Sequence, residues 1–219
     1  MKKNLVTIIA PLRDDNYHED SLTKTQFTIQ YALETIHSLK LEKNFSITLV
    51  DWGSKKPISE KIFIPKKFQK NITCYYVSEK IAKKESDEKF RLNVHKCWNI
   101  AERLTNAEYS INAHIDQIYS KSFFVNIKQL IDGNYLKKEK LDKTIFWIPR
   151  KFGDEDFFSK RPWPSKETVD KYFENINFAS QQWKNPGFFV GGGPAGFLAK
   201  TSIFRDLKGA KEDYISKTS

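Results

Sequence analysis

The segment "LVTIIAPLRDD", residues 5 to 15, decides the fold that the sequence predicts. Residues 5 to 10 form a nearly continuous apolar run, which is typical of a strand buried on both faces of a parallel sheet. Pro11 ends this strand and turns the chain outward at its carboxyl end. Because ligands bind at that edge of open α/β sheets, Pro11 and Arg13 are candidate ligand-binding residues.

Further along the chain, helical and strand patterns alternate. We expect buried strands at 45–50 and 72–77, a fourth strand at 107–116, a strand at 144–150, and helices at 22–40, 92–104 and 120–131. The helix at 92–104 carries Trp98, Ala101 and Leu104 on its apolar stripe. Residues 150–187 are rich in proline and aromatic residues, and we expect an irregular excursion there. This order predicts an α/β fold with a mixed, mainly parallel sheet flanked by helices.

Composition bounds the class of protein. The 219 residues are 39% hydrophobic and suit one domain with its own core. Cys74 and Cys97 have no C-x-x-C spacing, so we expect two core thiols in a reducing compartment. The apolar run at the N-terminus is too short for a signal peptide, and no segment approaches the roughly 18 apolar residues of a membrane span. We therefore expect a cytoplasmic protein without a membrane span.

The chain is basic, with a formal charge of +10 and a pI of about 9.4. This excess of positive charge is compatible with an anionic partner such as a phosphorylated ligand, a membrane surface or nucleic acid. Acidic residues are interleaved with the lysines, however, and no basic helix with interleaved aromatic residues is present. We therefore expect no nucleic-acid partner.

The segment "DWGS", residues 51 to 54, follows the second predicted strand. Asp51 would stand at the carboxyl edge, where a carboxylate can accept hydrogen bonds from a base or from ribose hydroxyls. Gly53 permits a tight turn. The alternative is that the segment is an ordinary turn after a strand.

The segment "HID", residues 114 to 116, ends the fourth predicted strand. Alternation of side chains would expose Asn112, His114 and Asp116 on one face while the other face is buried. An imidazole and a carboxylate can together hold Mn²⁺, which tolerates this mixture better than Mg²⁺ does. Alternatively, His114 packs at the strand end and Asp116 caps the following helix.

The segment "GGGPAGFLA", residues 191 to 199, brings three consecutive glycines together. Such glycines allow a close approach of the backbone to a ligand, and a hinge or plain loop is the alternative. The segment lacks the Gly-Lys-Ser/Thr ending of a P-loop and the G-x-G-x-x-G spacing of a dinucleotide fingerprint.

Taken in order, these segments resemble the GT-A fold of family 2-type glycosyltransferases. The matching pieces are "IIAPLRDD", "LETIHSL" (33–39), "DWGS", "NIAERLTNAEY" (99–109), "HID" and "GGGPAGFLAKTSIFRDLKGAKEDY" (191–214). The last piece is similar to the galactosyltransferase and polypeptide N-acetylgalactosaminyltransferase type. The resemblance covers residues 5–119 and 188–214. It implies a Rossmann-like nucleotide-diphospho-sugar transferase domain over 1–219, with a nucleotide-binding half at 1–120 and an acceptor-side half at 121–219.

The resemblance also implies a reaction and its site. The chain would be an inverting hexosyl- or N-acetylhexosaminyltransferase that uses a UDP- or GDP-sugar, with a glycan or other hydroxyl compound as acceptor. His114 and Asp116 would hold Mn²⁺ (or Mg²⁺), which stabilises charge on the departing diphosphate. The nucleotide-sugar would be bound by Pro11, Arg13, Asp51, Gly53, Ser54, Arg91, Asn99, Gly192 and Gly193.

The sequence departs from the family pattern in three places. D-x-D is replaced by H-x-D, and "DDGS" by "DWGS", where Trp52 either stacks on a ligand or packs inside. The family's general base lies in a further C-terminal segment, so Glu212 or Asp213 is the candidate base here. The chain ends five residues after Tyr214, and we expect a fragment or an unusually short member.

Two other functions remain open. A catalytically inactive GT-A-like module would bind nucleotide or sugar without transfer, and the H-x-D segment favours it. A nucleotidyltransferase would share the α/β sheet and the divalent ion, but it needs a loop rich in glycine and lysine after the first strand. The segment "PLRDDNYHED" has no such composition.

Overall fold

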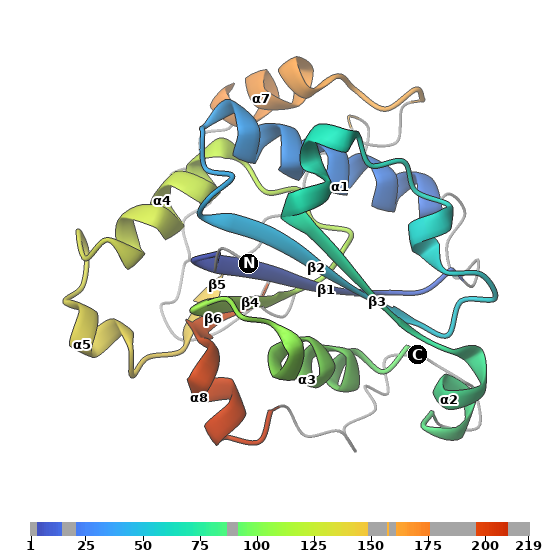
Figure 1. Ribbon diagram of the computed structural model, residues 1–219. Helices are drawn as coiled ribbons and strands as arrows, with labels where there is room; N and C mark the ends of the chain where they lie inside the picture. The colour runs from blue at the N-terminus through green and yellow to red at the C-terminus, as the bar shows by residue number, and fades with distance from the viewer. Residues whose placement is uncertain are drawn as a thin grey trace, which may run out of the picture.

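The computed structural model describes residues 4–14, 21–86, 92–148, 157, 161–175 and 196–209 (Figure 1). Within them a sheet of six strands has the order β3-β2-β1-β4-β6-β5. The strands are β1 (Val6–Leu12), β2 (Phe45–Trp52), β3 (Ile72–Val77), β4 (Tyr109–Ala113), β5 (Phe146–Ile148) and β6 (Gly196–Lys200). The helices are α1 (Ser21–Ser38), α2 (Glu79–Lys84), α3 (Val94–Leu104), α4 (Lys121–Ile131), α5 (Lys138–Leu141), α7 (Lys166–Asn175) and α8 (Thr201–Asp206), with 3₁₀ turns η1 (Ile58–Glu60) and η2 (Lys66–Asn71).

The sheet is mixed and mainly parallel. Strand β1 pairs in parallel with β2 and β4, and β2 pairs in parallel with β3. Strand β6 runs antiparallel to both β4 and β5. The prediction of an α/β fold with a mainly parallel, helix-flanked sheet is confirmed. The division into halves at residue 120 stays a prediction.

Helices cover both faces of the sheet. Figure 1 shows α1, α4 and α7 on one side and α2, α3 and α8 on the other. Every residue of β1 and β2 is buried, as their apolar sequences predicted. Alternate residues divide between two cores, so that Ile8 and Leu49 face α1 and α4, while Ile9 and Val50 face α3.

Strand β3 corrects one prediction. It was expected to be a buried strand, but it lies at the edge of the sheet and is only partly buried. Cys74, expected in the core, is exposed on it, whereas Cys97 is buried on α3 as predicted. An edge strand has one neighbour and less helical cover, so the same apolar composition leaves more surface in water. Leu104 also differs from the predicted stripe: it is the last residue of α3 and is exposed.

Residues 166–175 form helix α7, although an irregular conformation was expected there. The helix is attached to α1 and α4 through one carboxylate. Asp170 accepts a hydrogen bond from the Tyr31 hydroxyl at 2.8 Å and pairs with Lys166 at 2.6 Å and Lys121 at 3.0 Å. Desolvation opposes ionisation of Asp170, but these partners prevail and lower its pKa. These contacts fix a segment whose sequence alone shows weak periodicity.

In the part of the chain that the structure describes, none of the helices has both the length and the apolar character needed to cross a bilayer.

Candidate functional site

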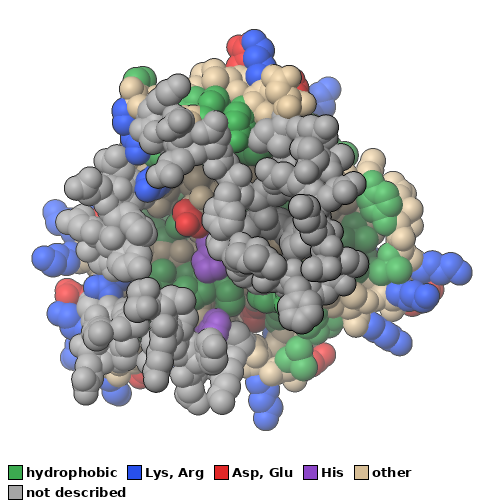
Figure 2. Space-filling model, turned by 180° about the vertical axis from the view of Figure 1, so that it is seen from behind, with side chains coloured by type: hydrophobic (Ala, Val, Ile, Leu, Met, Phe, Trp, Pro, Cys, Tyr) green, Lys and Arg blue, Asp and Glu red, His purple; other side chains and the backbone are tan. Residues whose placement is uncertain are grey.

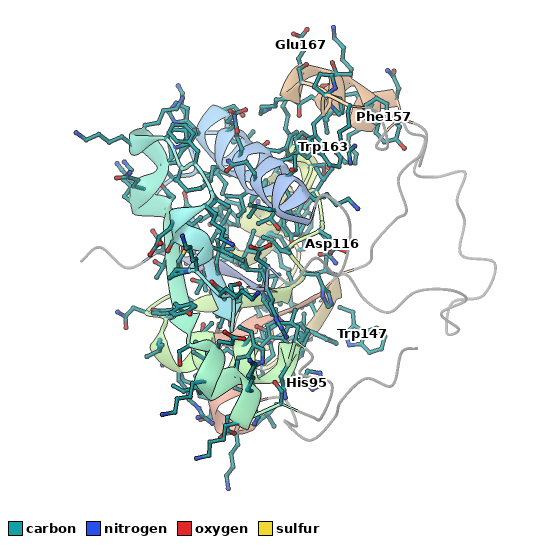
Figure 3. All side chains as sticks on the ribbon, turned by 90° about the vertical axis from the view of Figure 1, so that its right-hand side faces the viewer. His95, Asp116, Trp147, Phe157, Trp163 and Glu167 are labelled. Atoms are coloured by element: carbon teal, nitrogen blue, oxygen red, sulfur yellow. The ribbon has the colours of Figure 1, made fainter. Side chains whose placement is uncertain are left out.

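The carboxyl ends of three adjacent parallel strands, β2, β1 and β4, meet at one edge of the sheet. This carboxyl edge brings together seven of the predicted site residues: Pro11, Arg13, Asp51, Gly53, Ser54, His114 and Asp116. The backbones of Asp51 and His114 lie about 10 Å apart, since β1 separates their strands. Figure 3 shows Asp116 on the same side of the molecule as His95. Figure 2, which views that side, shows histidine and acidic side chains near its centre.

Asp51 shapes the loop after β2. Its Oδ1 accepts hydrogen bonds from the Ser54 hydroxyl at 2.5 Å and the Ser54 N–H at 3.3 Å, and its Oδ2 accepts one from the Ile58 N–H at 2.8 Å. Gly53 takes a φ of 79°, which a residue with a Cβ seldom adopts. Burial raises the pKa of Asp51, and its hydrogen bonds oppose that rise. Both oxygens are therefore already engaged in holding the turn.

Ser54 connects this loop to the one that follows β1. Its hydroxyl accepts a hydrogen bond from the Asp14 N–H at 2.9 Å while it donates to Asp51. The Ser54 carbonyl accepts from the Tyr76 hydroxyl of β3 at 2.9 Å, and Lys61 pairs with the Asp14 carboxylate. The two loops expected to hold the nucleotide are thus joined to each other.

The end of β4 differs from the prediction. The strand was expected to reach residue 116 with one exposed face, but it ends at Ala113 and all five of its residues are buried. Helices cover both faces, and among the described residues Ala113 opposite Gly196 is the last pair with β6. His114 and Asp116 lie in the turn that follows the strand.

The backbone of that turn is fixed by side chains. Three successive carbonyl groups, those of residues 113, 114 and 115, each accept one hydrogen bond from a side chain. In that order the donors are Trp98 Nε1 at 3.2 Å, the Tyr119 hydroxyl at 3.2 Å and Thr28 Oγ1 at 2.7 Å. Because these donors belong to α3, to the segment before α4 and to α1, the turn is attached on both faces of the sheet.

His114 packs beside an aromatic side chain of α3. Its ring lies 5.9 Å from that of Trp98, at an interplanar angle of 69°, and His95 contacts Trp98 from one turn earlier at 5.5 Å. His114 and His95 are both half-buried. The carboxyl edge therefore carries a second imidazole near the first.

Asp116 is exposed and does not cap the following helix. The N-cap of α4 is Ser120, whose hydroxyl accepts from the Phe123 N–H at 3.3 Å. The pKa of the Tyr119 phenol is raised, first by its burial and then by the negative charge of Asp116. The capping alternative for Asp116 is thus wrong, and its carboxylate faces solvent beside the fixed turn.

His114 and Asp116 are the residues predicted to bind a divalent ion. Among the described residues, no group of three or more His, Cys, Asp and Glu side chains could hold a metal ion. Mg²⁺ is usually bound by one or two protein carboxylates together with waters and substrate phosphates, and an imidazole beside a carboxylate also suits Mn²⁺. The binding of a divalent ion by His114 and Asp116 stays a prediction.

The other predicted residues divide as follows. Pro11 lies inside β1 rather than at its end, because pairing with β2 continues to Leu12 while pairing with β4 stops at Ile9. Trp52 packs inside: it is 1% exposed in the core beneath α3 and donates to the Ser86 hydroxyl at 3.1 Å. Arg91, Gly192, Gly193, Glu212 and Asp213 lie outside the described residues.

Asn99 is buried on α3, where it meets the turn after α8. A Cβ at Gly209, which has a φ of 80°, would come within 2.0 Å of Asn99 Oδ1. The absence of a side chain at Gly209 therefore allows this close contact. A role for Asn99 in nucleotide binding stays a prediction.

Sequence reasoning missed four contributors to the edge: His95, Trp98, Thr28 and Tyr119. A signal was present for His95, which stands three residues before Trp98 and so shares its helix face. The Thr28 contact had no such signal, since 87 residues separate Thr28 from Ile115.

Comparison with known proteins finds similarity among solved structures. No protein-family model matches the chain, and no curated protein matches its sequence. Among solved structures, the glycosyltransferase TarS of S. aureus, residues 1–349, matches with a TM-score of 0.53 and 12% sequence identity. The match covers 97% of this chain and 52% of the TarS chain, so this chain spans about half the length of that structure. At this identity the similarity establishes the fold alone: a Rossmann-like α/β fold of the kind found in a glycosyltransferase.

Proposed function

We propose that this chain transfers a hexosyl or N-acetylhexosaminyl group from a UDP- or GDP-sugar to a hydroxyl acceptor, with inversion and with Mn²⁺ or Mg²⁺. The fold shared with TarS supports a glycosyltransferase at the coarse level. The observation that carries the proposal is the fixed turn after β4. It presents an imidazole and a carboxylate at the edge where α/β sheets bind ligands, on a backbone held by three side-chain hydrogen bonds.

The roles of the residues follow from their positions. His114 and Asp116 would bind the ion together with the diphosphate oxygens of the donor. When bound, the ion supplies positive charge where the departing nucleoside diphosphate becomes negative. The loops after β1 and β2, joined through Ser54, would hold the nucleotide, with Arg13 as a cation on the first of them. Asp51 would act mainly by shaping its loop, since both of its oxygens are engaged.

Inverting transfer places the acceptor opposite the leaving group. The acceptor hydroxyl must lose its proton as it attacks the anomeric carbon, which requires a base within about 3 Å of that hydroxyl. Glu212 or Asp213 is proposed for this role from the resemblance alone.

Thermal-shift measurements with nucleoside diphosphates, nucleoside triphosphates and nucleotide sugars, each with and without Mn²⁺, test the proposal. We expect UDP or GDP, and one of their sugars, to raise the melting temperature only when Mn²⁺ is present, and EDTA to reverse the rise. Release of nucleoside diphosphate from the same sugar then measures turnover. Stabilisation without turnover would favour the inactive module. A response to nucleoside triphosphates with release of pyrophosphate would favour a nucleotidyltransferase, and either result would overturn the transferase proposal.

A further inference from the structure

Trp147 is a large aromatic side chain that remains 54% exposed on β5. Its neighbours across the sheet connect it to the carboxyl edge. Trp147 is paired with Phe197 of β6, and Phe197 is paired with Asn112 of β4. Directly paired residues place their side chains on the same face of a sheet. Trp147 therefore shares a face with Asn112, which lies two residues before His114.

The indole is held in a defined orientation. Its ring meets that of Phe197 at an interplanar angle of 83°, with 5.9 Å between centroids, an edge-to-face contact of the favourable kind. Figure 3 shows Trp147 projecting from the same side of the molecule as Asp116 and His95. Single exposed apolar residues are common and need no explanation. An oriented indole beside a candidate active site differs from them, because aromatic residues often line ligand sites.

The order of the strands determines which ligand can reach this indole. The loops proposed to hold the nucleotide follow β1 and β2, which lie on one side of β4, while β6 and β5 lie on the other. The diphosphate, at the end of β4, would thus separate the nucleotide from Trp147. An inverting transfer requires the acceptor to approach from the side opposite the leaving diphosphate. Trp147 stands on that side.

We propose that Trp147, supported by Phe197, binds a sugar ring of the acceptor, so that the acceptor is a glycan rather than a protein hydroxyl. This inference rests on the proposed function. A pyranose ring presents a face of C–H groups, which is apolar and slightly positive, and the face of an indole is apolar and slightly negative.

Fluorine NMR of the 5-fluorotryptophan-labelled protein tests the inference. The Trp147 signal is assigned from Trp147→Phe, and the protein is titrated with methyl glucoside, methyl galactoside, methyl N-acetylglucosaminide and cellobiose, without nucleotide or metal. We expect at least one of these sugars to shift the Trp147 signal saturably at millimolar concentration. If no sugar in this panel shifts it, the inference is overturned.

Saturation-transfer NMR, observed on the sugar, provides the comparison between variants. Trp147→Ala should reduce the saturation transferred to the sugar at least fivefold, while Trp147→Phe should retain part of it because the ring is kept. The matched control is Phe63→Ala, which removes another exposed ring, 72% accessible, and should leave the transfer unchanged. Equal signals from the wild type and Trp147→Ala would also overturn the inference.

The two proposals fail separately. The sugar titration contains neither nucleotide nor Mn²⁺, so it reports on Trp147 even if the nucleotide panel gives no response. Conversely, a metal-dependent response to UDP or GDP with an unresponsive Trp147 would leave the transferase proposal standing and remove only the acceptor site.

Discussion

The side-chain amide of Asn112 donates a hydrogen bond to the carboxyl group of Glu102, with 2.5 Å between Nδ2 and Oε1, and both residues are almost fully buried. The pair joins β4 to α3 two residues before His114. Burial raises the pKa of Glu102 to about 7, against the opposing effects of Asn112 and of the positive charges of Arg205 and Arg103. Asn112 Oδ1 has no hydrogen-bond partner among the described residues. A protonated Glu102 fits this arrangement, because its O–H can donate to that oxygen.

The Glu102 carboxyl predicts a specific dependence of stability on pH. Its pKa rises from 4.5 to about 7 on folding, so the folded protein holds a proton that the unfolded chain releases. The contribution to the free energy of unfolding is fully present below about pH 4.5. It is lost as the pH rises to about 7, and it amounts to at most about 3 kcal/mol.

Glu102→Gln should remove this dependence. The glutamine amide is always neutral, and it can accept from Asn112 Nδ2 while donating to Asn112 Oδ1. Urea unfolding of wild type and variant between pH 4.5 and 8 measures the difference. We expect the variant to gain in relative stability as the pH rises. The exposed Glu139→Gln serves as the control and should track the wild type. A constant difference between Glu102→Gln and wild type would contradict the assignment.

Thr28→Val tests whether the turn after β4 is held from α1. Valine keeps the shape of threonine but removes the hydroxyl that donates to the Ile115 carbonyl at 2.7 Å. The lost bond should lower the free energy of unfolding by about 1–2 kcal/mol. It should also weaken the Mn²⁺-dependent binding of nucleoside diphosphate several-fold, because the ligands on the turn would be held less firmly.

Thr144→Val is the matched control for that experiment. Thr144 Oγ1 donates to the Lys140 carbonyl at the same distance, 2.7 Å, but this bond is exposed and Thr144 lies three residues after α5, away from the turn after β4. We expect little loss of stability and no change in nucleotide affinity, which isothermal titration calorimetry would measure. Equal affinities for Thr28→Val and Thr144→Val would show that the α1 contact does not support the site.

Ser54→Ala tests the connection between the loops after β1 and β2. The substitution removes the donor to Asp51 and the acceptor for the Asp14 N–H, and it leaves Asp51 with one fewer partner in a buried position. We expect a loss of about 1–3 kcal/mol in the free energy of unfolding and weaker nucleotide binding. Ser122→Ala, at an exposed position of α4, should change neither quantity. A stable Ser54→Ala with wild-type affinity would remove Ser54 from the site.

The sequence predicted the parts of this fold that are encoded locally. The apolar runs of β1 and β2 and the carboxyl-edge position of Asp51 follow from periodicity and from the geometry of parallel sheets. The exposure of Cys74 did not, because it depends on the position of β3 at the edge of the sheet. No local pattern reports the order of strands.

The support of the site was also beyond sequence reasoning. Thr28 reaches Ile115 across 87 residues, and Trp98 reaches Ala113 across 15, from helices on opposite faces of the sheet. Only the packed structure brings these donors to successive carbonyl groups. Asp51 illustrates a different difficulty. A carboxylate after a strand can bind a ligand or hold a turn, and the choice depends on where its oxygens point.

Asp116→Asn and His114→Ala test the metal ligands directly. Asparagine keeps the size of aspartate but removes the negative charge that binds a divalent ion. Alanine at position 114 removes the imidazole ligand. Asp116 is exposed, so its substitution should leave the melting temperature without ligand almost unchanged. In each variant we expect the Mn²⁺-dependent rise in melting temperature with UDP or GDP to disappear. Asp132→Asn, an exposed aspartate at the end of α4 paired with Lys128, is the control and should retain the full rise. Because the comparison is made at equal charge change, a rise that survives in Asp116→Asn as fully as in Asp132→Asn would exclude Asp116 as a ligand.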